Sequence, residues 1–180
     1  MMRRTPIALA ALLVLSACWN GAAWFTAEQA VQAIPDGRYR LVEPGAQSPE
    51  SGDTISIAQQ PDHSLSITGP DNPWRAIVVP VDPALPGRFI VQLQQISAGR
   101  PDSSAGFVLL DTRAGGYRIS ILACAGAARD AVERSGGHVS RDPQSAASCI
   151  FADRATFLTQ FRAAAQAELA ADLELRPVDR

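Results

Sequence analysis

Three cysteines and two histidines are the side chains of this 180-residue chain that could carry metal or nucleophile chemistry. Zinc sites usually contain ligand pairs spaced as Cys-x2–4-Cys. Among Cys124, His138 and Cys149, the closest two candidates lie 11 positions apart, which argues against a metal site. A Cys–His nucleophile would need a reduced thiol and a third group that orients the histidine, and the spacing indicates none. We therefore expect no metal, no cofactor and no catalytic residue here.

The N-terminal segment has the features of an export signal. Arg3 and Arg4 provide positive charge, and residues 7–15 form an almost unbroken apolar run. This run is too short to cross a bilayer, since a spanning helix needs about 20 apolar residues. A positive start, a short apolar run and small residues before a cleavage point are typical of a secretory signal. We expect residues 1–17 to be removed.

Residues 15–18, Leu-Ser-Ala-Cys, resemble the lipobox of bacterial lipoproteins. The resemblance implies that Cys18 becomes the first mature residue and carries acyl chains, palmitate among them, that hold the protein on a membrane. In that family an aspartate after the cysteine favours the inner membrane, whereas this chain has Trp19 there. The resemblance therefore implies the outer membrane, facing the periplasm, in preference to the inner membrane. The alternative is an ordinary secretory signal, with Cys18 a plain thiol.

The two remaining cysteines form an even pair once Cys18 is used by lipid. Exported proteins enter an oxidising compartment, where cysteine pairs form disulfides. We predict a bridge between Cys124 and Cys149; two buried free thiols are the alternative. Such a bridge would connect a predicted strand to the segment before the last predicted helix.

Composition limits the possible partners. The chain has 16 basic and 18 acidic residues, and loss of Arg3 and Arg4 leaves a formal charge of −4. A nucleic-acid partner would favour a basic surface, so we expect none. All basic residues are arginines, which excludes chemistry that depends on lysine. We assign residues 18–25 to a lipidated tether and residues 26–180 to one periplasmic domain.

Alternation of apolar and polar residues predicts a sheet. Strict alternation is typical of strands with one buried face, and continuous apolar runs of strands covered on both faces. Short connections between the runs favour antiparallel neighbours. Alternating apolar residues occur in five runs: Tyr39 and Leu41; Ile55 and Ile57; Leu65 and Ile67; Phe89, Val91 and Leu93; and Tyr117, Ile119 and Ile121. Residues 76–79 and 107–110 are continuous apolar runs.

Two helices complete the predicted fold. Thr26 and Gln29 match a capping box, which predicts a short helix through Ala33. Asp153 precedes an apolar stripe at helical spacing, which predicts a long C-terminal helix. The fold class expected is α+β: an antiparallel sheet or partly closed barrel of about seven strands, with a short N-terminal and a long C-terminal helix.

Several polar positions have two interpretations. His63 lies in a turn sequence, where solvent exposure is the ordinary expectation. Arg134, His138 and Arg141 flank a Gly-Gly pair and could bind an anion or form the solvated side of a loop. The amphipathic rings of Trp19 and Trp24 could lie at the membrane–water interface; the alternative is that Trp24 and Phe25 pack on the domain.

The leading functional hypothesis is a non-catalytic binding or structural module of the cell envelope. Its partner would be an envelope protein, cell-wall material or a small apolar ligand. An inhibitor of exported hydrolases is the second hypothesis, with residues 69–73 and 136–143 as the loops that could enter an active site. An enzyme whose site residues lie far apart in sequence is the third.

Overall fold

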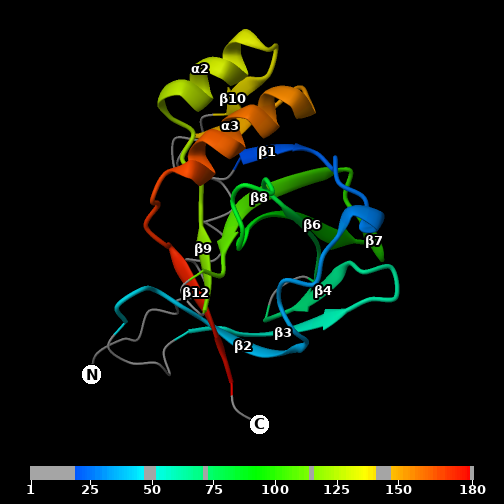
Figure 1. Cartoon of the computed structure of the whole chain (residues 1–180). Helices are drawn as coiled ribbons and strands as arrows, with labels where there is room; N and C mark the ends of the chain where they lie inside the picture. The colour runs from blue at the N-terminus through cyan, green and yellow to red at the C-terminus, as the bar shows by residue number, and fades with distance from the viewer. Residues whose placement is uncertain (1–18, 47–51, 71–72, 114–115, 141–146, 179–180) are drawn as a thin grey trace, which may run out of the picture.

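The computed structural model describes residues 19–46, 52–70, 73–113, 116–140 and 147–178. Strands dominate these residues (Figure 1), and helices are few and short. In chain order the elements are β1 (Trp19–Ala22), η1 (Ala27–Gln29), β2 (Gly37–Val42), β3 (Thr54–Gln59), β4 (Leu65–Thr68), β5 (Trp74–Pro80), β6 (Arg88–Ser97), β7 (Arg100–Pro101), β8 (Ser104–Asp111), β9 (Tyr117–Ser120), α2 (Gly126–Arg134), β10 (His138–Ser140), β11 (Ser148–Ile150), α3 (Arg154–Gln166) and β12 (Leu173–Pro177).

Eight strands form a closed antiparallel barrel in the order β8-β9-β12-β2-β3-β4-β5-β6. Pairing of β6 with β8 closes it, with a register that runs from Arg88 opposite Asp111 to Leu93 opposite Gly106. Four further strands lie outside the ring. β1 pairs with β8, β11 with β1, β10 with β11, and β7 with the end of β6. The barrel and its outer layer are visible end-on in Figure 1.

The predicted α+β class is therefore wrong, because the described chain is mostly β and the barrel is closed. The five alternating runs and the two continuous runs do form strands, but the closing contacts join segments that are distant in sequence. Residues 173–177 illustrate this: β12 lies inside the wall, between β9 and β2. The prediction of a long C-terminal helix is also wrong, because α3 is short, with 13 residues, and is followed by the strand β12. The predicted N-terminal helix is only the three-residue turn η1.

Alternating residues of β5, β6 and β8 serve two separate cores. Val78, Val91 and Val108 point into the barrel, where they join a mainly aliphatic cluster. Ile90 and Phe107 point outward into a second cluster, which is rich in aromatic rings. The buried residues of the inner cluster are Ile34, Tyr39, Ile57, Leu65, Ala76, Val78, Val91, Val108, Leu110 and Leu175. The aromatic members of the outer cluster are Trp19, Phe25, Phe107, Phe151, Phe157 and Phe161.

The outer cluster is covered by β1, β11, α2 and α3, which lie together on one side of the barrel (Figure 1). Asp153 begins α3 by accepting a hydrogen bond of 2.8 Å from the Thr156 backbone N–H, as expected of an N-cap. After α3, the buried Arg88 of β6 donates to the Ala167 carbonyl at 3.1 Å and so holds the helix end on the barrel. None of the described helices is long and apolar enough to cross a membrane.

Candidate functional site

The start of β1 is the part of the structure nearest to the predicted lipidation site. Cys18 itself lies outside the described residues. Trp19, its chain neighbour, is 2 % exposed and belongs to the outer core. Its indole Nε1 donates to the Ala123 carbonyl at 3.1 Å, and its ring lies 5.0 Å from that of Phe151 and 5.9 Å from that of Phe161. Trp19 is thus already fixed in the folded domain by its burial, its hydrogen bond and its ring contacts.

Two strands share one edge of β8 at this point. Trp19 of β1 lies opposite Phe107, and Ser120 of β9 lies opposite Leu109. Val108 therefore marks the place where the pairing passes from one strand to the other. The chain enters the fold beside the residues that follow β9, which begin with Ile121.

The structure joins Cys124 and Cys149 in a disulfide, as the sequence predicts, with Cα atoms 5.1 Å apart. Cys149 lies in β11, which runs parallel to β1, with Ile150 opposite Asn20. The Phe151 backbone N–H also donates to the Asn20 carbonyl at 2.9 Å. The bridge therefore ties the segment after β9 to the strand that flanks β1, and β1 lies between two stabilised neighbours.

The aromatic residues near the N-terminus pack on the domain. Trp24 stacks on Phe107 with ring centroids 5.4 Å apart, and Phe25 is buried. Of the two interpretations of these residues, packing is the one observed. The Arg154 guanidinium lies 5.0 Å from the centroid of the Phe25 ring, which adds a cation–π contact on the solvent side.

Gln92 is a buried residue that holds this segment in place and that sequence reasoning missed. Its side-chain Oε1 accepts from the Phe25 N–H at 2.9 Å, and its Nε2 donates to the Phe25 carbonyl at 3.1 Å. The residue is on the outer face of β6, where a buried amide needs partners. The available signal was a glutamine at a position between two apolar residues of a strand, which also fits a solvated face.

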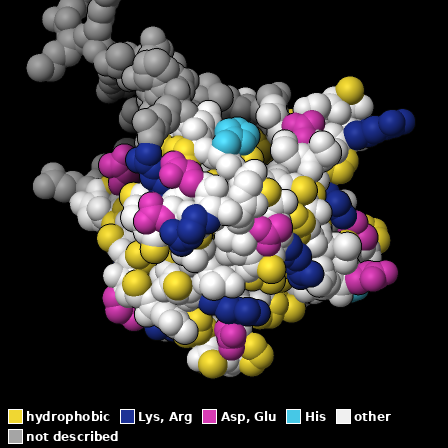
Figure 2. All heavy atoms as spheres, turned by 90° about the horizontal axis from the view of Figure 1, so that it is seen from above, with side chains coloured by type: hydrophobic (Ala, Val, Ile, Leu, Met, Phe, Trp, Pro, Cys, Tyr) yellow, Lys and Arg dark blue, Asp and Glu magenta, His cyan; other side chains and the backbone are white. Residues whose placement is uncertain are grey.

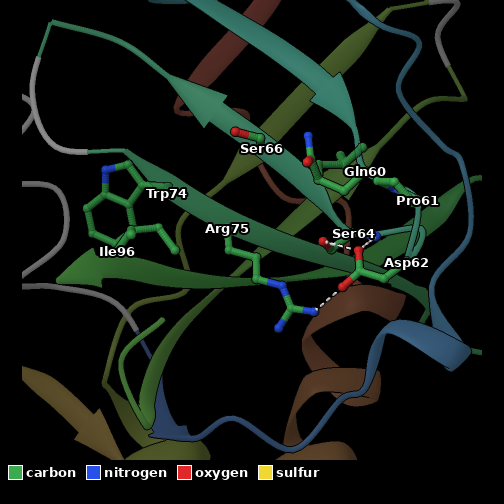
Figure 3. Close-up of a pocket in the computed structure, with 9 residues that line it drawn as sticks. Gln60, Pro61, Asp62, Ser64, Ser66, Trp74, Arg75 and Ile96 are labelled. Carbon is green, nitrogen blue, oxygen red and sulfur yellow. Dashed lines mark hydrogen bonds and ion pairs between the residues drawn. The ribbon is translucent and has the colours of Figure 1, made fainter. Parts of the chain in front are cut away.

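A shallow, open depression of about 390 Å³ lies at the turn between β3 and β4, beside β5 and the end of β6 (Figure 3). Asp62 accepts hydrogen bonds from the Ser64 N–H at 3.0 Å and the Ser64 hydroxyl at 2.6 Å, and Arg75 forms an ion pair with it at 2.7 Å. The Ser64 donors, with help from Arg75, lower the pKa of Asp62 to about 2. Trp74 and Ile96 provide the apolar side of this depression.

His63 occupies the tip of the same turn with φ of +67° and is exposed, as expected for a turn histidine. The hydroxyl of its neighbour Ser64 donates a hydrogen bond to the carboxylate of its other neighbour, Asp62, which explains the tight turn. The side chain has no role in the ion pair with Arg75.

The remaining candidates do not converge. His138 is exposed in β10, and Arg134 ends α2 beside a second depression of about 410 Å³ between α2 and α3. Arg141 lies outside the described residues, as do parts of both loops suggested for hydrolase inhibition. Within the described ranges, no group of three or more His, Cys, Asp or Glu could hold a metal ion.

Charges on the face above α2 and α3 are mixed in sign, with acidic and basic side chains interspersed among apolar ones (Figure 2).

Comparison with known proteins adds no identity: no family model, curated protein or solved structure matches the chain.

Proposed function

We propose that this chain is a lipoprotein of the bacterial cell envelope, anchored through acyl chains on Cys18, whose barrel is a non-catalytic binding or structural module. The observation that carries the proposal is the combination of the lipobox at residues 15–18 with the burial of Trp19. Removal of residues 1–17 would leave every described strand intact.

The acyl anchor is the membrane contact in this proposal. Each buried methylene of an acyl chain contributes about 0.8 kcal/mol, so a protein with more than one chain is stably held. A mature formal charge of −4 gives no electrostatic attraction to anionic lipid. Trp19 in place of aspartate favours the outer membrane, facing the periplasm. Fractionation of inner and outer membranes tests this part.

The non-catalytic assignment is supported by the structural contacts that the reactive side chains make. Cys124 and Cys149 are bridged, which removes both as nucleophiles. The carboxylates whose pKa is lowered are held in an ion pair or a cap: Asp62 by Ser64 and Arg75, Asp111 by Arg113, and Asp153 by Thr156. The contacts that lower these pKa values do so by stabilising the ionised carboxylates. Such carboxylates provide no general acid near neutral pH.

The shallow depression beside Trp74 is the surface proposed for the partner. Arg75 is oriented by its ion pair with Asp62, and a fixed guanidinium can bind a carboxylate or another anionic group with little loss of entropy. An indole next to polar groups is typical of binding surfaces, since it offers a large rigid contact area.

Recovery of partners from detergent-solubilised envelope tests the module. We expect the wild-type protein to recover one stoichiometric partner and the Trp74→Ala variant to recover much less. Arg38→Ala, which removes an exposed arginine of β2, is the matched surface control and should behave as wild type. Recovery of an inactivated hydrolase, or turnover of an envelope substrate by the pure protein, would contradict the proposal.

A further inference from the structure

We infer that the lipid-bearing protein rests directly on the bilayer, with the uncharged segment Ile121–Ala127 against the membrane surface. This inference depends on lipidation of Cys18, as proposed above. It adds an orientation of the anchored domain, since the barrel would lie at the membrane surface and not at the end of a flexible tether. The surface of this segment would contact the headgroup region of a lipid bilayer.

The first argument is the length of chain available. Consecutive Cα atoms are about 3.8 Å apart, so one peptide unit separates an acylated residue 18 from Trp19. Trp19 cannot move outward, because its backbone is in register with Phe107, its indole donates to Ala123, and its ring is packed in the outer core. The acyl chains would therefore leave from the surface of the domain itself.

The second argument is which residues surround that point. Pairing along β8 passes from Trp19 to Ser120 across Val108, so Trp19, the first described residue, lies close to the end of β9 and to the segment that follows it. The hydrogen bond from the Trp19 indole to the Ala123 carbonyl places the next residues against β1 as well. The segment that follows β9 is thus the neighbour of the anchor.

The third argument is the chemistry of this segment. Residues 120–128 read Ser-Ile-Leu-Ala-Cys-Ala-Gly-Ala-Ala and carry no charge. Ala123, Ala125, Gly126 and Ala127 are exposed, so small uncharged side chains form the surface of the segment itself, and the exposed Asp172 lies at its edge. Dehydration of such a surface costs little compared with that of a charged one. The nearby Asp172 carboxylate is engaged with the Ile121 N–H at 2.7 Å.

The disulfide ties this segment to β11 and, through the pairing of β11, to β1. Cys124 lies within the segment, and its partner Cys149 is in β11, the strand beside β1. A shift of the segment away from β1 would require that bridge or the Trp19 contacts to break. The orientation on the membrane therefore follows from the fold and needs no additional partner.

Photo-cross-linking to lipid tests the orientation on the full-length, processed protein in phosphatidylcholine vesicles. A benzophenone amino acid replaces Ala127 in one variant and Ala58 in the control. Ala58 is also an exposed alanine and lies on β3, which is across the barrel from β8 in the closed ring of eight strands (Figure 1). We expect lipid adducts at position 127 to exceed those at position 58 several-fold.

A second variant carries a short flexible Gly/Ser linker between Cys18 and Trp19, which restores a tether. We expect it to keep its lipid and its membrane retention while the adducts at position 127 fall to the level of position 58. Mass measurement of each sample separates the two proposals. Absence of acyl chains on Cys18 would contradict the proposed function. Acylated protein with equal adducts at positions 127 and 58, or with adducts unchanged by the linker, would overturn the orientation alone.

Discussion

The inside of the barrel and its covered outer side share the strands β5, β6 and β8, yet the two cores differ in composition and in the other elements that they connect. Inside, side chains such as Val78, Val91 and Leu110 make a mainly aliphatic core from the inward-facing, alternate residues of the strands. Outside, Phe107 and Phe157 lie in an aromatic cluster to which β1, α2, α3 and β11 all contribute. The inner core closes the ring, while the outer core attaches the N-terminal strand to it.

This difference assigns separate roles to the two regions. The strand that follows the proposed lipidation site is held by backbone pairing with β8 and β11 and by the outer cluster, and the disulfide fixes β11 beside it. A weakened outer core should therefore loosen the anchored end before the barrel opens. A weakened inner core should lower the stability of the ring without selective exposure of β1.

The largest expected effect comes from Phe157→Ala. Phe157 is fully buried and contacts several rings, with the nearest centroid, that of Phe107, at 4.4 Å. Truncation of a buried phenylalanine costs about 3–5 kcal/mol of unfolding free energy. Urea denaturation should show this loss, with faster amide exchange in β1 than in β3. The matched inner-core variant, Leu110→Ala, should cost about 2–5 kcal/mol with no preference for β1. Equal exchange of β1 and β3 in both variants would contradict the separation of the two cores.

Removal of the disulfide is the next prediction. Cys124→Ala combined with Cys149→Ala opens a loop with a sequence separation of 25, for which chain entropy predicts a loss of about 3.5 kcal/mol. Thermal or denaturant unfolding measures the loss, and amide exchange should locate it at β1 and β11. Reduction of the wild-type protein should reproduce the change. If β3 exchanges as fast as β1 in the double variant, the bridge does not act locally.

A smaller effect is expected for Gln92→Leu. The substitution leaves the N–H and the carbonyl of Phe25 without their partners, since Gln92 bonds to both. An unsatisfied buried polar group costs about 1–3 kcal/mol. Denaturation should show the loss, and Phe25 should become accessible to aqueous quenchers or to amide exchange. Gln166→Leu at the exposed end of α3 is the control and should leave stability unchanged. A neutral Gln92→Leu would mean that water replaces the amide.

The smallest effect concerns acid stability. The folded pKa of Asp62 is about 2, below its ordinary value near 4, so the ionised carboxylate stabilises the fold above pH 4. That contribution is lost as pH falls from about 4 to 2, and because the pair is exposed it amounts to less than about 1 kcal/mol. Asp62→Asn should therefore differ from wild type at pH 5 and converge with it near pH 2. A constant difference over this range would refute the assignment.

Local sequence patterns predicted the inward faces of the barrel well. The alternating residues around Tyr39, Ile55 and Val91 all belong to the inner cluster, because period two is a property of each strand by itself. The continuous runs at residues 76–79 and 107–110 do serve both cores, as expected of strands covered on two faces. The cysteine pairing also followed from simple counting.

What the patterns could not predict depends on distant partners. Residues 19–22 form β1 only because β8 and β11 accept them, and no alternation within four residues identifies such a strand. β12 likewise gains its place from β9 and β2, which are distant from it in sequence and make it part of the closed wall. Gln92 and the Asp62–Arg75 pair were missed for the same reason, since polar residues of strands and turns usually face solvent.

Mass analysis of the mature protein from native membranes tests the central claim most directly. The account predicts a chain that begins at Cys18 and carries a diacylglycerol and an acyl chain on that residue. A water-soluble chain that begins at another residue, or one with an unmodified Cys18, would contradict it.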